Sequence, residues 1–309
     1  MSRTNKSRFR GSISLLLCLV SLFIAVFVYL GKDGVVSLLD STVNISKSFD
    51  TSSDFIRFLD VGQGDSVLIY SNGRSMLLDT GTVNSANEVC RILDLCDIKE
   101  IDVLMFSHLH SDHTGGVQRI CEDFAVKNLI LPEISVYSEG LSSAQYAMNC
   151  VKQIGGGVYN AIEGMNFKVG EIEITVLASF GELADENNRS LFVMAEIENK
   201  KFFFSGDAEK EAERLLLKEN LNLDCDVFKL AHHGSNTSNT KELLNELTPR
   251  YAVISVGYDN SYGHPHDEIV TEVNKRNIEI LRTDINGDIT FYIENGKIIP
   301  KCEKIAEIS

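Results

Sequence analysis

The seven histidines of this 309-residue chain lie in three short segments, and the sequence has no histidine elsewhere. The segments are HLHSDH with His108, His110 and His113, AHHGS with His232 and His233, and YGHPH with His264 and His266. Imidazole is the commonest metal ligand in proteins. Histidines kept only in segments bordered by Asp and Gly therefore predict one shared site, and we expect a two-metal hydrolytic centre.

The HLHSDH segment offers four ligand-type side chains within six positions. His108 and His110 are two residues apart, so in an extended loop they point the same way, whereas Asp112 and His113 turn toward a neighbouring point. This spacing predicts two ligand pairs, one for each of two cations, which a helical H-E-x-x-H pattern does not. The alternative is a loop of hydrogen-bonded histidines with a helix-capping Asp, and the density of ligand types favours metal binding.

Two further strand ends carry ligand-type residues. Asp207 ends the apolar run KFFFSGD, where a carboxylate can bridge both cations or simply cap the following helix. His232 and His233 end DVFKLAHH, and alternation along a strand keeps both from facing one ion. We favour His233 as the ligand because it adjoins Gly234, which leaves His232 behind the metal or beside the substrate.

The remaining polar positions are expected around the metals rather than on them. His264 is a candidate general acid or phosphate-facing donor, with a hydrogen-bonded loop histidine as the alternative, and His266 falls where a helix begins. Asp79 in LLDTG is expected to orient a ligand histidine, with a plain turn residue as the alternative. Side chains expected to support the site or contact substrate are Asn188, Ser190, His232 and Ser235, with Asn187 beside them in ENNRS.

The amino-acid composition limits the classes to which this protein can belong. The chain is 44% hydrophobic, which is typical of a globular protein, and its formal charge of −15 argues against binding duplex nucleic acid through a basic face. An anionic substrate then needs local positive charge, which bound divalent cations would provide. The seven cysteines form no C-x-x-C pair, so they do not indicate a zinc ribbon, and no disulfide is assigned.

The N-terminus predicts a membrane anchor. Basic residues of segment 1–11 precede an uncharged apolar run at 12–30, which is long enough as a helix to cross a bilayer. The positive flank predicts a cytoplasmic tail with the rest of the chain extracytoplasmic. A cleaved signal peptide is the alternative, but no A-x-A-like site follows Leu30. Residues 31–52 are expected to be a linker, and 53–309 the hydrolase domain.

Apolar strand-like runs alternate with amphipathic helical stretches from Phe55 onward. The predicted strands span 55–62, 66–71, 75–81, 101–108, 189–197, 201–207, 226–233 and 251–257. The predicted helices span 88–96, 115–124, 209–220, 241–248 and 267–275. Two half-sheets with helices between their strands predict an α/β fold in the form of a four-layer αββα sandwich.

The ordered motifs LLDTG, HLHSDHTGG, FFFSGD and AHHGS resemble those of the metallo-β-lactamase superfamily over residues 55–309. DVGQGDS, ENNRSLFV, LAHHGSNTS, YAVISVG and YGHPH further resemble the extracellular metallo-hydrolase domain of the competence protein ComEC and its stand-alone relatives. The resemblance implies an αββα fold with a dinuclear site. It assigns the metal positions to His108, His110, Asp112, His113, Asp207 and a histidine of HHGS.

In this resemblance the usual third-motif histidine is absent and ENNRS takes its place, so the first metal has fewer strong ligands and is expected to be weakly held or replaced by manganese. The expected cofactors are two divalent metal ions, zinc or manganese. Relatives of this branch are implicated in phosphodiester hydrolysis, including that of the strand discarded during DNA uptake. Together with the predicted anchor, we therefore expect a membrane-anchored, extracytoplasmic phosphodiesterase or nuclease. In the mechanism we expect, Asp112 positions the nucleophile and His264 protonates the leaving group. ComEC carries a multi-helix channel and this chain one predicted span, so no transport activity is inherited.

Two other functions remain open. A cell-surface esterase acting on phosphorylcholine or teichoic-acid groups suits the acidic composition, whereas a lactamase or lactonase is less favoured. A non-enzymatic surface protein stabilised by its metals is the second alternative, and the incomplete ligand set favours catalysis because structural zinc sites are closed. The expected partners are a phosphodiester or other anionic ester, with single-stranded DNA among the candidates, and the membrane; no partner protein is predicted.

Overall fold

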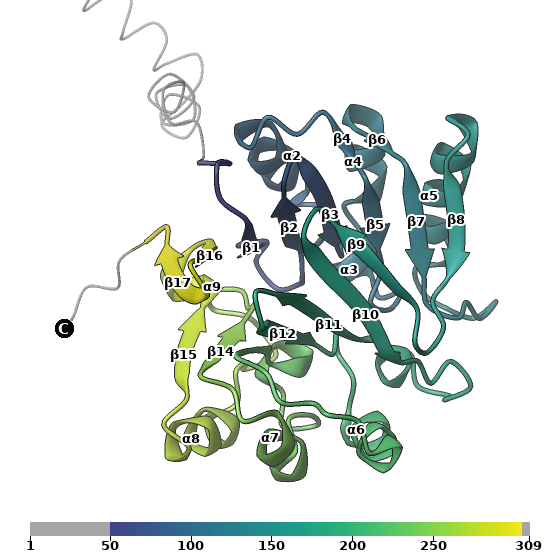
Figure 1. Ribbon diagram of the computed structural model, residues 1–309. Coiled ribbons are helices and arrows are strands. Elements are labelled where there is room, and N and C mark those ends of the chain that lie inside the picture. Colours follow the sequence, from purple (N-terminus) through teal and green to yellow (C-terminus); the bar gives the residue numbers. More distant parts are fainter. Residues whose placement is uncertain (1–49, 305–309) are drawn as a thin grey trace, which may run out of the picture. The chain divides into compact units, whose positions relative to one another are not determined.

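Two mixed β-sheets face each other in the computed structural model, which describes residues 50–304 (Figure 1). The first sheet has the order β17 (Lys297–Cys302), β16 (Ile289–Glu294), β1 (Phe55–Phe58), β2 (Val67–Ser71), β3 (Arg74–Leu78), β5 (Val103–Met105), β7 (Asn128–Leu131) and β8 (Gly157–Asn160). The second has the order β15 (Glu279–Arg282), β14 (Tyr251–Ile254), β13 (Val227–Lys229), β12 (Lys200–Phe204), β11 (Phe192–Ile197), β10 (Ile172–Ala178) and β9 (Asn166–Val169).

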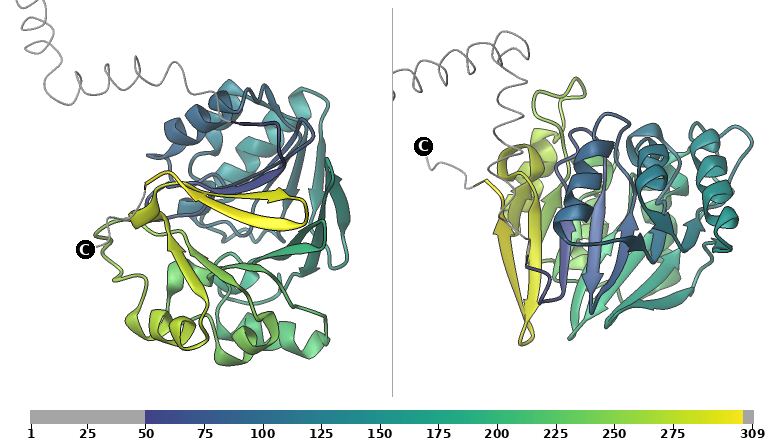
Figure 2. Two further views of the ribbon diagram at one scale, coloured as in Figure 1. Left: turned by 60° about the vertical axis from the view of Figure 1, so that its left-hand side comes forward. Right: turned by 90° about the horizontal axis from the view of Figure 1, so that it is seen from above.

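Helices cover the outer faces of both sheets, and this confirms the predicted four-layer αββα architecture (Figure 2). The first sheet carries α2 (Ala86–Leu95), α4 (Val117–Asp123) and α5 (Leu141–Gln153), and the second carries α6 (Lys210–Leu216), α7 (Lys241–Leu247) and α8 (Asp267–Lys275). In α2 the buried residues include Ala86, Val89, Cys90 and Leu93, a spacing of three and four that gives one apolar face.

The core between the sheets is rich in phenylalanine. Phe58 of β1 stacks on Phe204 of β12 with ring centroids 5.9 Å apart, and Phe291 of β16 lies 5.8 Å from Phe58 and 5.7 Å from Phe202. Phe203, between Phe202 and Phe204 in sequence, points to the opposite face and packs in the cluster beneath the second set of helices. This period-two alternation explains how a run of three aromatic residues serves both layers.

The carboxyl ends of strands meet at one edge of the molecule. β3 pairs in parallel with β5, and β12, β13 and β14 are mutually parallel. The chain leaving these strands contains LLDTG, HLHSDH, SGD and HHGS. Ligand-binding loops of α/β proteins gather at this edge, so the topology positions the candidate site.

All eight predicted strands are shorter in the structure, and two of them differ in a way that bears on the site. The run at 101–108 is divided into β4 (Glu100–Ile101), which pairs with β6 (Ala125–Val126), and β5, and helix α3 (Ser111–Thr114) begins inside HLHSDH. The run at 226–233 ends at Lys229, and the two histidines lie in the 3-10 turn η4 (Ala231–Gly234). The premise that strand alternation separates these two histidines was therefore wrong.

The predicted tail 1–11, membrane span 12–30 and linker up to residue 49 lie outside the described residues. Within residues 50–304, no helix combines the length and the apolar character needed to cross a bilayer. The described cysteines are free thiols, and Cys90, Cys96 and Cys225 are buried.

Candidate metal centre

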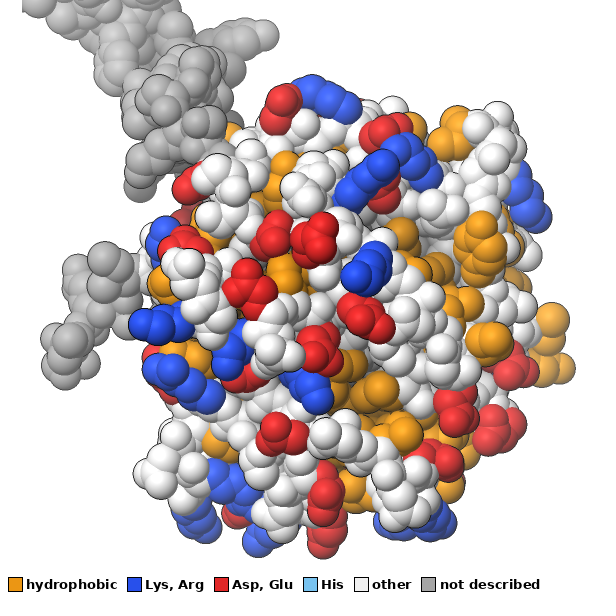
Figure 3. Space-filling view, viewed as in Figure 1, with side chains coloured by type: hydrophobic (Ala, Val, Ile, Leu, Met, Phe, Trp, Pro, Cys, Tyr) orange, Lys and Arg blue, Asp and Glu red, His pale blue; other side chains and the backbone are white. Residues whose placement is uncertain are grey.

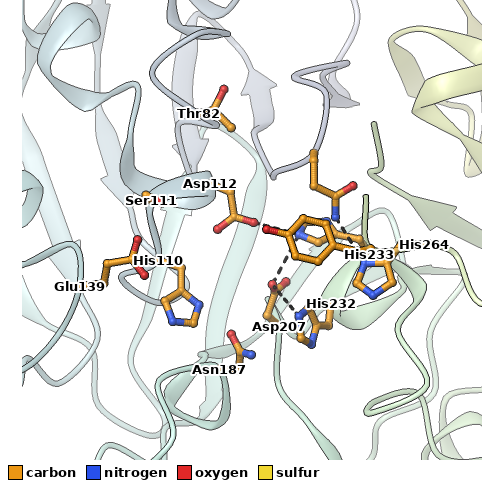
Figure 4. Close-up of a pocket in the computed structure, with 12 residues that line it drawn as sticks. Thr82, His110, Ser111, Asp112, Glu139, Asn187, Asp207, His232, His233 and His264 are labelled. Carbon is orange, nitrogen blue, oxygen red and sulfur yellow. Dashed lines mark hydrogen bonds and ion pairs between the residues drawn. The ribbon is translucent and has the colours of Figure 1, made fainter. Parts of the chain in front are cut away.

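Four side chains from three segments bring one ligand atom each to within 4.8 Å of all the others: Asp112, His113, Asp207 and His233. The Nε2 atom of His233 lies 3.2 Å from Oδ2 of Asp112 and 3.5 Å from Oδ2 of Asp207. The latter oxygen lies 3.4 Å from Nε2 of His113. Figure 4 shows Asp112, Asp207 and His233 pointing toward one another. We call these four residues the metal cluster.

Two atoms of the metal cluster have no hydrogen-bond partner within residues 50–304, although both are buried: Nε2 of His113 and Oδ1 of Asp207. Buried polar atoms in folded proteins are nearly always paired, so these two need a partner. Imidazole nitrogen and carboxylate oxygen are the donor set that zinc and manganese accept. The metal cluster therefore fits a divalent cation.

His108 and His110 lie beside the metal cluster as a pair. Nε2 of His108 is 3.1 Å from Nδ1 of His110, and the ring centroid of His108 is 4.1 Å from that of His113. Burial, together with the neighbouring His113, holds the pKa of His108 well below its usual value. His108 is therefore neutral, which is the form that binds metal.

The metal cluster has strongly coupled electrostatics. Burial alone would lower the pKa of His113, but the carboxylates of Asp207 and Asp112 raise that pKa well above its usual value. Burial would raise the pKa of Asp207, but His233 and His113 hold it well below its usual value. The pKa of Asp112 is lowered in the same way against its own burial. Both carboxylates are therefore ionised, and protons on the histidines balance their charge without metal.

Asp79 lies directly behind His113. Its Oδ2 atom is 2.8 Å from Nδ1 of His113 and accepts from the Ser107 hydroxyl at 2.6 Å, and its Oδ1 accepts from the Ser107 backbone N–H at 2.7 Å. Burial raises the pKa of Asp79. Because Nδ1 of His113 donates to Asp79, Nε2 faces the metal cluster. Asp79 also has φ of 62°, a strained conformation for a non-glycine residue that commonly marks a functional site.

The ENNRS side chains support the loop of Asp207. The hydroxyl of Ser190 accepts from the backbone N–H of Asp207 at 3.0 Å. Oδ1 of Asn188 accepts from the N–H groups of Glu209 and Ala212, at the start of α6. Asn188 and Ser190 are buried behind the metal cluster, which agrees with a supporting role rather than substrate contact, and Asn187 lines the pocket.

The HHGS turn places its two histidines differently. His232 and His233 have φ of 51° and 54°, and Nδ1 of His233 donates to the Ser255 carbonyl at 2.9 Å, which directs Nε2 into the metal cluster. Nε2 of His232 lies 3.9 Å from Asp207 and lines the pocket. The buried Ser235 hydroxyl lies 3.1 Å from that of Thr237, within the turn.

Sequence reasoning missed a charged pair beside the metal cluster. Lys229 forms a buried ion pair with Asp65, and its Nζ lies 4.0 Å from Oδ1 of Asp207. The sequence feature that could have revealed this pair is the lysine inside the apolar run DVFKLA, because a charge within a buried strand needs a partner. The segment of Asp65 also packs on the HLHSDH turn, because the backbone N–H of Asp65 donates to the Asp112 carbonyl at 3.2 Å. A side chain at Gly64 would collide with that same carbonyl oxygen.

The metal cluster opens into a cavity of about 450 Å³. Its walls include Gln63, Glu139 and Tyr262, and the described residues that line it include three carboxylates but no Lys or Arg. His264 lies in the wall, where burial and the neighbouring His233 lower its pKa to about 4. The His264 ring is therefore neutral, which suits a hydrogen-bond donor better than the general acid that the sequence predicted.

His266 lies outside this cavity. Its Nδ1 accepts from the backbone N–H of Asn236 at 2.9 Å, and the residue precedes helix α8. This arrangement agrees with the expectation that His266 falls where a helix begins.

The model of the metallo-beta-lactamase superfamily matches residues 59–258. ComE operon protein 3 of Bacillus subtilis is 28% identical over 79% of this chain and 34% of its own length. Competence protein ComA of Neisseria gonorrhoeae is 31% identical over 77% of this chain and 32% of its own length. This chain thus spans about a third of the length of these curated relatives.

Among solved structures, CmlA, a diiron beta-hydroxylase from Streptomyces venezuelae, has a TM-score of 0.52 at 15% identity. The similarity covers 78% of this chain and 54% of CmlA, and it shows the fold alone. The family match spans the strands and turns that build the metal cluster, and the curated relatives are competence proteins of the ComEC type. This chain belongs to the metallo-beta-lactamase superfamily.

Proposed function

We propose that this protein is a dinuclear metal-dependent hydrolase of the ComEC type that cleaves phosphodiester bonds. The observation that carries the proposal is the metal cluster, with the His108–His110 pair beside it, at the base of an open pocket. When bound, two divalent cations supply Lewis-acid charge and lower the pKa of water. The pocket has three carboxylates and no described Lys or Arg, so these cations would provide its attraction for an anionic ester.

Asp112 is placed to orient the attacking water. Its side chain is 31% exposed, whereas the other members of the metal cluster are buried, and its lowered pKa keeps the carboxylate ionised as a hydrogen-bond acceptor. Asp207 lies between His113 and His233 and holds the two sides of the site together. His264, in the pocket wall, donates a hydrogen bond to the substrate.

Single-stranded DNA is the proposed natural substrate class, supported by the similarity to Competence protein ComA. Lys and Arg side chains are scattered among Asp and Glu on the face drawn in Figure 3, an arrangement unlike the basic surface that holds duplex DNA. The N-terminal segment 12–30 is proposed to tether the domain outside the cell membrane, in a role in competence. Protease digestion of intact cells tests that orientation, because an extracytoplasmic domain is degraded and a cytoplasmic one is protected.

A choline-phosphate ester is the second candidate substrate. Tyr262 lines the pocket, and an aromatic face is a surface that quaternary ammonium groups prefer. Such a substrate would make the protein an esterase of cell-surface phosphorylcholine or teichoic-acid groups.

The deciding experiment uses the full-length protein in detergent, stripped with a chelator and reloaded with zinc or manganese. The panel contains single-stranded DNA, bis-p-nitrophenyl phosphate, p-nitrophenyl phosphorylcholine and nitrocefin. We expect metal-dependent cleavage of DNA and of bis-p-nitrophenyl phosphate. Preferential turnover of the choline ester selects the second candidate, and a metal-loaded protein that cleaves none of the panel is a metal-stabilised surface protein.

A further inference from the structure

The loop Gly257–His264 follows β14 and forms one wall of the pocket. The Asn260 side chain holds it closed, because its Oδ1 accepts from the backbone N–H groups of Tyr262 at 3.2 Å and His264 at 3.0 Å. Its Nδ2 donates to the carbonyls of Gly257 at 3.0 Å and His264 at 2.6 Å. The loop is therefore ordered by its own side-chain bonds before any ligand arrives.

Gln63 determines which nitrogen of His264 carries a proton. Its Oε1 accepts from the backbone N–H of Gly257 at 3.2 Å, so the amide orientation is fixed. Its Nε2 lies 3.4 Å from Nδ1 of His264 and can only donate. Nδ1 must therefore accept, and a neutral imidazole carries its single hydrogen on Nε2.

The Nε2–H group of His264 is free to donate, since within residues 50–304 the ring makes its only hydrogen bond to Gln63, through Nδ1. The ring lies close to the metal cluster, with its centroid 6.2 Å from that of His233 and 5.5 Å from that of His232. The donor therefore belongs to the same pocket as the metal cluster.

Tyr262 adds an aromatic surface at the same place. Its ring stacks on His264 with centroids 5.7 Å apart and an interplanar angle of 23°, and it lines the pocket although the residue is 66% exposed. Exposed aromatic rings beside a phosphate site are the surfaces on which bases of single-stranded nucleic acids stack. Tyr258 of the same loop is 85% exposed but is not among the residues that line the pocket.

We propose that Gln63, His264 and Tyr262 form a nucleotide subsite beside the metal cluster. His264 donates its Nε2–H to a non-bridging oxygen of the scissile phosphodiester, Gln63 is the positioning residue that fixes this tautomer, and Tyr262 stacks on the adjoining base. The inference rests on the proposed phosphodiesterase function and names what the pocket recognises in its substrate.

Kinetics with two esters test the stacking role. The full-length metal-loaded protein is assayed with thymidine 5′-(p-nitrophenyl phosphate), which carries a base, and methyl p-nitrophenyl phosphate, which carries none. Tyr262→Leu should lower kcat/KM for the thymidine ester roughly tenfold or more and that for the methyl ester by less than about threefold. Tyr262→Phe should behave as wild type, and so should Tyr258→Leu, the control from the same loop. Equal losses on the two esters would overturn the stacking role.

The tautomer is measured directly by ¹⁵N NMR of histidine-labelled, zinc-loaded protein, with His264 assigned from the signal lost in His264→Gln. The wild type should carry its proton on Nε2. In Gln63→Glu the new carboxylate should move a proton to Nδ1, and kcat/KM should fall at least tenfold on both esters with metal content unchanged. A wild-type ring protonated on Nδ1, or an active Gln63→Glu enzyme, would overturn the role of Gln63. If neither ester is cleaved by wild type, the proposed function fails, while NMR still decides the tautomer.

Discussion

The ammonium group of Lys229 and the carboxylate of Asp65 form a buried ion pair that connects the two sheets next to the metal cluster. Lys229 ends β13 of the second sheet, and Asp65 lies just before β2 of the first. Burial alone would lower the pKa of Lys229, but Asp65 and Asp207 raise it, so the lysine is charged. A fixed cation here offsets the negative charge that the site concentrates around Asp207.

Lys229→Met should destabilise the protein, because it leaves the Asp65 carboxylate buried without its partner. Breaking a buried pair in this way costs about 3–5 kcal/mol. Urea unfolding of the metal-free protein measures the free energy of unfolding. Asp65→Asn combined with Lys229→Met removes both charges and should recover part of the loss. A single variant within about 1 kcal/mol of wild type would show that the pair is dispensable.

Asp207→Ala should abolish both metal binding and turnover, since Asp207 contacts both imidazoles of the metal cluster. Elemental analysis of the purified protein and the phosphodiester assay measure the two effects. Glu163→Gln, an exposed carboxylate outside the pocket, is the matched control and should retain both metal and activity. Retained turnover in Asp207→Ala would reject the proposed mechanism.

The metal-free protein should be most stable near pH 6.5. The pKa values of His113 and His233 are raised in the fold, so their stabilisation is complete below the unfolded value of 6.5 and is lost as the pH rises through the folded values. The pKa values of His108 and His264 are lowered, to about 4 for His264, so their contribution is lost as the pH falls below 6.5. Each residue contributes a slope of up to about 1.4 kcal/mol per pH unit.

Urea unfolding between pH 5 and pH 8.5, with a chelator and then with zinc, tests this pH dependence. Zinc competes with protons for the histidines, so it should remove the decline above pH 6.5. A chelated protein whose stability keeps rising from pH 6.5 to pH 8.5 would contradict the raised pKa values of His113 and His233.

Local patterns in the sequence predicted the strands that precede the ligand turns, because apolar runs such as KFFFSGD are short, rich in aromatic residues and bounded by turn residues. They did not predict that β16 and β17, from the far end of the chain, extend the first sheet beside β1. Non-local pairing leaves no local signal. The pairing of Asp65 with Lys229 and of Gln63 with His264 was missed for the same reason, since each joins residues more than 150 positions apart.

The backbone conformation of η4 also could not be predicted from sequence patterns. Two successive histidines with positive φ are strained, and a sequence rule favours glycine there. Asn239 stabilises this strained turn, because its Oδ1 accepts from the backbone N–H of Ala231 at 2.9 Å. Its Nδ2 donates to the carbonyls of Ala231 at 2.9 Å and Ser235 at 3.2 Å. The side chain therefore spans both ends of the histidine turn.

Asn239→Ala should release this turn and displace His233 from the metal cluster. The buried backbone groups left without partners cost about 1–3 kcal/mol each, so we expect a loss of several kcal/mol in the metal-free protein and weaker zinc binding. Asn239→Asp keeps the acceptor for the Ala231 N–H but loses the two N–H donors. If Asn239 acts only by shaping the turn, the zinc affinity and stability of Asn239→Asp should lie between those of wild type and Asn239→Ala. Zinc affinity from competition with a chromophoric chelator, measured beside urea unfolding, separates the two effects. Wild-type affinity in Asn239→Ala would mean that the histidine turn keeps its strained backbone without this side chain.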